Sequence, residues 1–466
     1  MGKSSGTGRS ATVFEVMKGR AGRGILAMAV ACAAGLATAQ TAHSTPNTAD
    51  GFYAPPTGYA ETEPGTVLRS RPIAASFFQA LPMAVDAWQV LYRTTDSTGA
   101  PYSAVTTVLK PRQGNGTILS FQNMTDAIAP QCMPSQALQQ GQVPWLDFGE
   151  SQPIELTTMA NESPLVAAAL AKGWTVSVPD YGGVDNHFLA PKEPGYVILD
   201  GIRAVRNFDP AAAPADSKVL MWGYSGGGIA TGWAAQEQPS YAPELDVAAA
   251  ALGAPVGDFE AGIRSANGTL VGGALIPVAL MGMRQNSPEL AAALDRYLTP
   301  AGRQKIDDAT TACTPQNLLS NIGFDAARHL TVPLSEVLAD PVIQAAVQES
   351  ELGHTAPTAP LYVYNAIADE ISTIGGADTL VAGYCDSGVP VTYRREQLPM
   401  PLSGHTLEWA LGAPGALAWL QQQADAAAEP TGCEIASIPA TITDPAALGA
   451  LTSGIITGSV LGLFGL

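Results

Sequence analysis

Short apolar runs of strand length alternate with helical patterns along most of the chain. Apolar runs of about four to eight residues, bounded by glycine, proline or aspartate, are typical of buried strands. Strands that alternate with helices pair in parallel and carry helices on both faces of the sheet, so this order predicts an α/β fold. The expected strands are 116–121, 174–178, 219–222, 247–253, 360–366 and 389–394, and the expected helices are 165–172, 195–206, 229–238, 378–384 and 408–424.

A β-hairpin pattern precedes the alternating region. The β-like runs 88–94 and 104–109 flank the turn sequence Asp96-Ser97-Thr98-Gly99, which favours two strands joined by a tight connection. Residues 40–62, before the hairpin, are rich in threonine, proline and glycine and indicate a flexible lead-in.

The alternation stops between about residues 265 and 350. Helical patches follow one another there, and no convincing strand pattern lies among them. Strand and helix patterns resume at residue 360. We therefore expect one α/β domain over residues 63–434, with an inserted helical cap over about 265–350.

The composition is that of an acidic globular protein. Hydrophobic residues make up 46% of the 466 residues and charged residues only 14%, which is unlike a disordered chain and allows a large core. The formal net charge is −18. An acidic surface repels phosphate groups, so we expect no nucleic-acid partner.

The first 39 residues resemble a secretion signal peptide. An apolar run over 25–36 leads to Ala37-Thr38-Ala39, a small-residue cleavage site. The apolar run is short for a membrane span, which favours a cleaved signal over an N-terminal anchor. We therefore expect a secreted protein. The basic residues before the apolar run are Lys3, Arg9, Lys18, Arg20 and Arg23.

Residues 435–466 form an apolar, glycine-rich tail. From residue 445 onward the tail has no charged residue, and glycines recur at Gly454, Gly458 and Gly462. This spacing suits close helix packing in a bilayer, and the length is sufficient to span one. Glycine weakens helices in water, however, and no basic residue flanks the segment. Contact with a membrane or cell envelope and a tail that is flexible or packed on the protein surface both stay open.

Four cysteines follow the signal segment, namely Cys132, Cys313, Cys385 and Cys433. An even number in an exported chain predicts two disulfides, and three pairings are possible. No Cys-x-x-Cys sequence or histidine–cysteine cluster is present. We therefore expect no zinc or other metal site.

Candidate chemistry centres on Gly223-Tyr224-Ser225-Gly226-Gly227. G-x-S-x-G between a strand and a helix is the nucleophile elbow of α/β-hydrolases, in which a sharp turn exposes the serine oxygen. The small neighbours let strand and helix approach each other. A glycine-rich turn with an incidental serine is the alternative, but the flanking strand and helix patterns favour a nucleophile.

A serine nucleophile needs a base and an acid, which follow it in the order acid, histidine in this fold. His405 lies in a polar turn after the last expected strand and is the candidate base. Asp369 directly follows the expected strand 360–366 and is the candidate acid that orients the imidazole. Glu370 competes with Asp369, and Asp378 is a weaker candidate. The other histidines precede Ser225 or lie in the cap: His43, His187, His329 and His354.

The oxyanion formed during ester cleavage needs hydrogen-bond donors. The backbone amide of Gly226, directly after the nucleophile, is one candidate. Thr125 and Asp126 follow the expected strand 116–121, where the second donor belongs. Asp126 would donate through a protonated carboxyl or through its backbone amide, and an ordinary turn residue is the alternative.

The chain contains, in this order, Gly65–Pro72, Leu91–Asp96, Asp126 before Cys132-Met133-Pro134-Ser135, Val178-Pro179-Asp180-Tyr181, the elbow, Ala368-Asp369-Glu370 and Gly404-His405-Thr406. Together these motifs resemble the secretory lipase family. The resemblance implies Ser225, Asp369 and His405 as a catalytic triad, Asp126 and Gly226 as the oxyanion hole, and the helical cap. It also supports the pairing that we favour, Cys132–Cys313 with Cys385–Cys433. Two departures are the spacing from Asp126 to Cys132 and the glycine-rich tail.

These features favour a secreted serine carboxylester hydrolase, most simply a triacylglycerol lipase or esterase that needs no cofactor. Its partner would be a small lipid ester. One alternative is an esterase or acyltransferase acting on other lipid esters. The other is a non-catalytic hydrolase fold that binds lipid or cell-envelope partners. The presence of all three triad candidates disfavours the second alternative.

Overall fold

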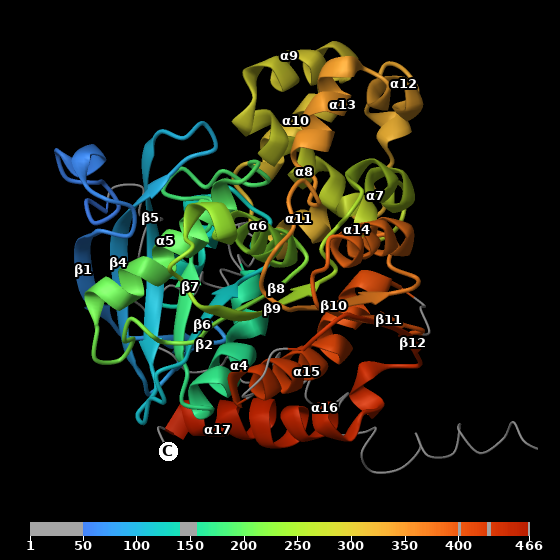
Figure 1. Cartoon of the computed structure of the whole chain (residues 1–466). Coiled ribbons are helices and arrows are strands. Elements are labelled where there is room, and N and C mark those ends of the chain that lie inside the picture. Colours follow the sequence, from blue (N-terminus) through green and yellow to red (C-terminus); the bar gives the residue numbers. More distant parts are fainter. Residues whose placement is uncertain (1–49, 140–155, 399–401, 426–429, 465–466) are drawn as a thin grey trace, which may run out of the picture. The chain divides into compact units, whose positions relative to one another are not determined.

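The structure is a computed structural model that describes residues 50–139, 156–398, 402–425 and 430–464 (Figure 1). The predicted signal peptide and the first part of the predicted lead-in lie outside the described residues. In the part of the lead-in that is described, a short 3₁₀ turn, η1 (Tyr59–Glu61), precedes the first strand.

A ten-stranded sheet forms the centre of the described chain, in the order β1-β4-β5-β7-β6-β8-β9-β10-β11-β12. The pairs along β1-β4-β5-β7 are antiparallel, and all pairs from β7 to β12 are parallel. The predicted α/β architecture is therefore confirmed, and the predicted hairpin is β4–β5. The strands are β1 (Val67–Ile73), β4 (Asp86–Thr95), β5 (Pro101–Lys110), β6 (Ile118–Gln122), β7 (Thr175–Pro179), β8 (Val219–Tyr224), β9 (Val247–Gly253), β10 (Leu361–Ala366), β11 (Val391–Glu396) and β12 (Cys433–Ile438).

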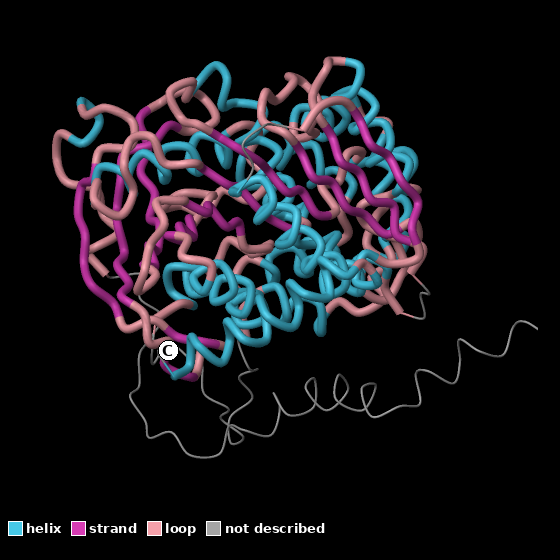
Figure 2. The backbone as a smooth tube through the Cα atoms, turned by 60° about the horizontal axis from the view of Figure 1, so that its bottom comes forward, coloured by secondary structure: helices cyan, strands magenta, loops and turns pink. Residues whose placement is uncertain are grey.

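Helices cover both faces of this sheet (Figure 2). On one face α5 (Glu193–Phe208), α6 (Gly226–Tyr241) and α14 (Ile374–Asp386) bury one apolar core. On the other, α4 (Thr158–Ala171) and α15 (Gly404–Asp425) bury a second. Strand β8 shows why the central strands are unbroken apolar runs in the sequence. Successive side chains point to opposite faces of the sheet, and both faces are buried.

The segment between β9 and β10, which is described throughout, is helical and stands above the carboxyl ends of the parallel strands (Figure 1). Its first helix begins at Phe259, a few residues before the expected start of the cap, and its last ends at Glu349. We call this segment the cap. Its helices are α7 (Phe259–Ala266), α8 (Gly272–Asn286), α9 (Pro288–Tyr297), α10 (Pro300–Ala309), α11 (Thr314–Ser320), α12 (Leu334–Leu338) and α13 (Pro341–Glu349), with the 3₁₀ turn η3 (Ala326–Arg328).

The segment read from the sequence as a tail contains regular structure. It begins with β12, the edge strand, and continues through 445–464 as a continuous helical stretch that is long and apolar enough to cross a membrane by length and composition alone. Its parts are α16 (Pro445–Gly449), the π-helical turn η5 (Ala450–Ile456) and α17 (Thr457–Phe464).

The glycine face of this terminal helix packs on the protein itself. A Cβ atom at Gly458 would lie 2.8 Å from Cα of Ala168 in α4, and one at Gly454 would lie 3.3 Å from Leu417 in α15. The glycine spacing therefore serves close packing within this chain. The opposite face is apolar and exposed, with Leu448, Ile456, Val460 and Phe464 between 39% and 71% accessible.

Two disulfides tie distant segments together, in the pairing that the family resemblance implies. Cys132–Cys313 joins the turn η2 (Pro130–Cys132) to the start of cap helix α11, and Cys385–Cys433 joins α14 to β12. The remaining short elements are β2 (Ser76–Phe77) paired with β3 (Leu81–Pro82), α3 (Pro134–Ala137) and η4 (Thr441–Thr443).

Candidate active site

Ser225 lies at the sharp turn between β8 and α6. Its backbone is left-handed, with φ 54° and ψ −122°, which is strained for a residue other than glycine. The glycines around it are required by space: a Cβ atom at Gly223 would lie 2.1 Å from the Gly227 carbonyl oxygen, and one at Gly227 would lie 2.0 Å from that of Gln122. The turn therefore closes only with residues that lack a side chain at these positions.

The fold brings Ser225, His405 and Asp369 together. His405 Nε2 lies 2.8 Å from Ser225 Oγ, and His405 Nδ1 lies 2.8 Å from Asp369 Oδ2. All three side chains are buried. The other carboxylate oxygen, Oδ1 of Asp369, accepts the backbone N–H groups of Ile371 and Ser372, each at 2.8 Å. The carboxylate is therefore held in one orientation toward the imidazole.

Glu370, the competing acid, has a different role. Its Oε2 accepts the backbone N–H of Gly404 at 2.9 Å and that of His405 at 3.4 Å, at the start of α15. A carboxylate at this position stabilises the first turn of a helix. The helix thus begins at Gly404, not at residue 408 as expected, and His405 lies in its first turn. The sequence pattern predicts 389–394 as the last strand before His405, with none after it. This prediction is wrong, because β12 follows α15 in the structure.

The remaining weaker candidates contact other groups. Asp378 Oδ2 pairs with Arg395 at 3.0 Å. His187 Nδ1 lies 2.8 Å from Glu193 Oε1, and the ring of His329 stacks on Phe324. His354 Nε2 lies 3.1 Å from the Gln348 carbonyl oxygen. His43 lies outside the described residues.

Asp126 lies beside the nucleophile turn, in the segment that follows β6. We call residues 123–126 the oxyanion loop, after the role predicted for Asp126 from the sequence. A Cβ atom added to Gly226 would lie 2.0 Å from Asp126 Oδ1, so the carboxyl lies directly against this glycine. Oδ1 is buried and has no hydrogen-bond partner among the described residues. Such a group is available to an incoming polar atom.

Electrostatics couple Asp126 to His405. Burial raises the pKa of Asp126 to about 6, while the charge of His405 and the residue's own backbone N–H lower it. Burial lowers the pKa of His405, but the charge and hydrogen bond of Asp369, with the charges of Glu370 and Asp126, outweigh it and raise the pKa above 6.5. The pKa values of Asp126 and His405 are therefore both raised, each partly through the other group.

Glu162 of α4 holds the oxyanion loop from the core side through hydrogen bonds. The sequence patterns alone do not identify this residue. Its carboxylate accepts the Met124 backbone N–H at 3.1 Å, the side-chain N–H of Asn123, and Trp409 Nε1 at 3.3 Å. Burial raises its pKa to about 8, against the lowering effect of these donors. Asn123 in turn accepts the hydroxyls of Thr125 and Thr158 through Oδ1. The only sequence signal was a single charged residue in a helix that has no other.

An apolar cavity of about 80 Å³ opens beside Ser225. Core and cap line it together, so an acyl group bound there would touch both. Ile263 and Ile276 also line a second apolar cavity inside the cap. Side chains that line the first cavity include Phe188, Leu189, Ile229, Val256, Leu275 and Ile371. Among the described residues, no group of three or more histidine, cysteine or acidic side chains is placed to hold a metal ion.

Known proteins are similar to this chain in sequence and in fold. The sequence model of the secretory lipase family matches residues 150–431. A probable inactive lipase of Mycobacterium tuberculosis is 37% identical and aligns over 80% of this chain and 81% of its own length. Lipase A of Arthroderma benhamiae is 36% identical over 90% of this chain and 88% of its own.

The structure is similar to an X-ray structure of Candida antarctica lipase A in its closed state. The TM-score is 0.75 at 26% sequence identity, and the match covers 90% of this chain and 96% of that one. The α/β-hydrolase fold predicted from the elbow is therefore confirmed.

Proposed function

The chain belongs to the secretory lipase family, and on that premise we propose that it is a serine carboxylester hydrolase with Ser225 as nucleophile, His405 as base and Asp369 as the orienting acid. The observation that carries the proposal is the pair of 2.8 Å contacts that link Ser225 Oγ to His405 and His405 to Asp369. Nucleophile, base and orienting acid in this geometry are the arrangement that activates a serine hydroxyl.

In the proposed reaction, Ser225 Oγ attacks the ester carbonyl carbon while His405 Nε2 takes the hydroxyl proton. The resulting oxyanion accepts hydrogen bonds from the Gly226 N–H and from Asp126. His405 then protonates the leaving alcohol as its C–O bond breaks, which leaves an acyl group on Ser225. Water, deprotonated by His405, attacks the acyl carbon, and the acid is released as Ser225 regains its proton.

A non-catalytic lipid-binding role is the alternative, because the name of one relative, the M. tuberculosis protein, describes it as a probable inactive lipase. The complete set of three side chains within hydrogen-bonding distance favours catalysis over this alternative. Covalent labelling of Ser225 by a fluorophosphonate separates the two. A folded protein that is not labelled would contradict the enzyme proposal.

The apolar cavity beside Ser225 favours esters of longer acyl chains, including triacylglycerols. Each buried methylene contributes about 0.8 kcal/mol, so we expect kcat/KM on p-nitrophenyl octanoate to exceed that on the acetate by about tenfold or more. Emulsified triacylglycerol should also be cleaved. Turnover of acetyl and butyryl esters alone would leave an esterase or acyltransferase on other esters as the better description.

Asp126 is proposed as an oxyanion donor through its protonated carboxyl. Replacing Asp126 with alanine should lower kcat about 100-fold, the usual cost of one lost donor. Asp126→Asn keeps an N–H donor and should retain more activity. Wild-type kcat in the alanine variant would limit donation to backbone amides.

Secretion is proposed on the basis of the N-terminal signal pattern and the two disulfides, which form in oxidising compartments. The mature protein in the culture medium should begin at Gln40. A protein that retains residues 1–39 and stays with the membrane fraction would contradict cleavage.

Contact with a membrane or cell envelope is proposed through the exposed face of the terminal helix. Four large apolar side chains point outward there, and the 20-residue helix carries no charge. The wild type should float with neutral phosphatidylcholine vesicles, and Phe464→Asp should weaken this binding. Absence of wild-type flotation would contradict the proposal.

A further inference from the structure

We propose that Thr314, a cap residue, is a positioning residue that sets the geometry of the oxyanion loop. The inference rests on the proposed ester hydrolysis and assigns a side chain of the cap to it. Thr314 is the first residue of α11 and is 4% exposed. It touches the loop and not the reacting atoms.

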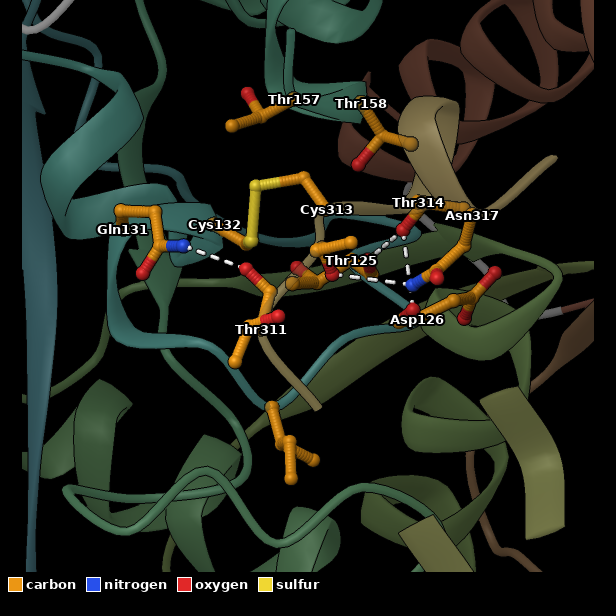
Figure 3. The surroundings of a disulfide bond; sticks show 12 residues. Thr125, Asp126, Gln131, Cys132, Thr157, Thr158, Thr311, Cys313, Thr314 and Asn317 are labelled. Carbon is orange, nitrogen blue, oxygen red and sulfur yellow. Dashed lines mark hydrogen bonds between the residues drawn. A yellow bond between two sulfur atoms is a disulfide. The ribbon is translucent and has the colours of Figure 1, made fainter. Parts of the chain in front are cut away.

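The hydroxyl of Thr314 lies against two consecutive carbonyl groups of the loop (Figure 3). Its Oγ1 is within hydrogen-bonding distance of the carbonyl oxygen of Thr125 and lies 3.1 Å from that of Asp126. A threonine hydroxyl has one proton, so it donates to one of the two carbonyls at a time. Both carbonyls are therefore held toward the cap.

The direction of these carbonyls determines where the amides of the loop point. A trans peptide is planar, so the N–H of Asp126 points opposite to the carbonyl of Thr125. Asp126 has a φ of 38°, in the left-handed region that a residue other than glycine adopts only when its surroundings hold it there. Thr314 restrains this part of the loop from the cap side through its hydroxyl. Glu162 restrains Asn123 and Met124 from the core side through its carboxylate.

The start of α11 is itself fixed to the core. Cys313, next to Thr314, is bonded to Cys132, and both are 1% exposed. Gln131 Nε2 donates to the Thr311 carbonyl at 2.9 Å, and Asn317 Nδ2 to the Ala312 carbonyl at 3.1 Å (Figure 3 shows the first of these). The Thr314 hydroxyl therefore has a fixed place relative to the loop.

Loss of the hydroxyl should affect the transition state more than substrate binding. The Asp126 carboxyl lies against Gly226, where the oxyanion would form, and a shift of about 1 Å at such a site costs up to about 100-fold in rate. The acyl cavity is lined by other residues and does not include Thr314. A role in positioning thus predicts a change in kcat with KM preserved.

The test replaces Thr314 with valine, which has nearly the same shape and no hydroxyl. We expect kcat on p-nitrophenyl butyrate to fall about 10- to 100-fold, with KM within about twofold of the wild type. Thr314→Ser should restore most of the activity. Thr331→Val is the matched control, because the Thr331 hydroxyl also donates to a cap carbonyl, that of Tyr297, and does not touch the loop. It should leave kcat unchanged.

The rate of Ser225 labelling by a fluorophosphonate is measured on the same proteins, since the adduct places an oxygen where the oxyanion forms. If the wild type is labelled but hydrolyses no ester, the proposed function is contradicted. The role of Thr314 can still be tested in that case, because the labelling rates of the variants can be compared with that of the wild type. If Thr314→Val and Thr314→Ser have the same kcat and the same labelling rate, the hydroxyl has no effect and the proposed role of Thr314 is overturned. If the valine variant does not fold, Thr314→Ala replaces it with the same expectation.

Discussion

Replacing Ser225 with alanine is expected to lower ester turnover by about 10⁶-fold, the loss seen when a serine hydrolase loses its nucleophile. The hydroxyl is the atom that forms the acyl-enzyme, and no neighbouring group can replace it. Residual activity should come only from binding and oxyanion stabilisation. Turnover of p-nitrophenyl butyrate by purified protein measures the loss, with substrate binding followed separately.

The control is Ser240→Ala near the other end of the same helix, where the hydroxyl donates to the Glu237 carbonyl and to no other group among the described residues. This variant should match the wild type in turnover. Circular dichroism and thermal unfolding should show both variants folded, since each substitution removes one hydroxyl and leaves the backbone conformation unchanged. A Ser225→Ala protein that still hydrolyses esters and still takes up a fluorophosphonate would place the nucleophile elsewhere.

Local patterns were sufficient for the central strands of the sheet and for the turn at Ser225. Strand β8 is buried on both faces, so its apolar run is visible without any knowledge of its partners. The elbow is equally local, because the steric demands on Gly223 and Gly227 arise within a few residues of Ser225. For such elements the physical constraint and its sequence signal lie in the same short window.

The end of the chain was harder to predict because its packing partners are distant. Strand β12 is an edge strand with mostly exposed side chains, so it has no apolar run. The glycines of the terminal helix suggested a bilayer partner, and the partner in the structure is α4, nearly 300 residues earlier in the sequence. Regularly spaced small residues indicate that a helix packs closely, but they do not indicate whether it packs against a membrane-embedded helix or against the same chain.

Supporting residues of the site left little that could be distinguished in the sequence. Thr314 contacts a carbonyl 189 residues away, and an isolated threonine in a helical cap resembles many others. Glu162 is an acid within a helix, a residue type that is usually solvated. Their roles depend on atoms that the fold brings together, so only the three-dimensional arrangement identifies them. The triad candidates were accessible because chain order in this fold restricts them.

The choice between Asp369 and Glu370 leads to the second large effect. Asp369→Asn should lower kcat about 10⁴-fold, because the amide would present an N–H to His405 Nδ1 and favour the wrong imidazole tautomer. Oδ1 would still accept the N–H groups of Ile371 and Ser372, so the backbone should stay in place. The Asn variant should therefore be folded and nearly inactive.

Glu370→Gln provides the matched comparison at the neighbouring acid. Glu370 caps α15 through the Gly404 N–H and does not touch the imidazole nitrogens, so its amide variant should keep kcat within a few-fold. Loss of the charged cap should instead lower the free energy of unfolding by about 0.5–2 kcal/mol. Kinetics and thermal unfolding of the two variants separate the roles. If Glu370→Gln abolished turnover while Asp369→Asn spared it, the orienting acid would be Glu370, and the 2.8 Å contact between Asp369 and His405 would have to be structural.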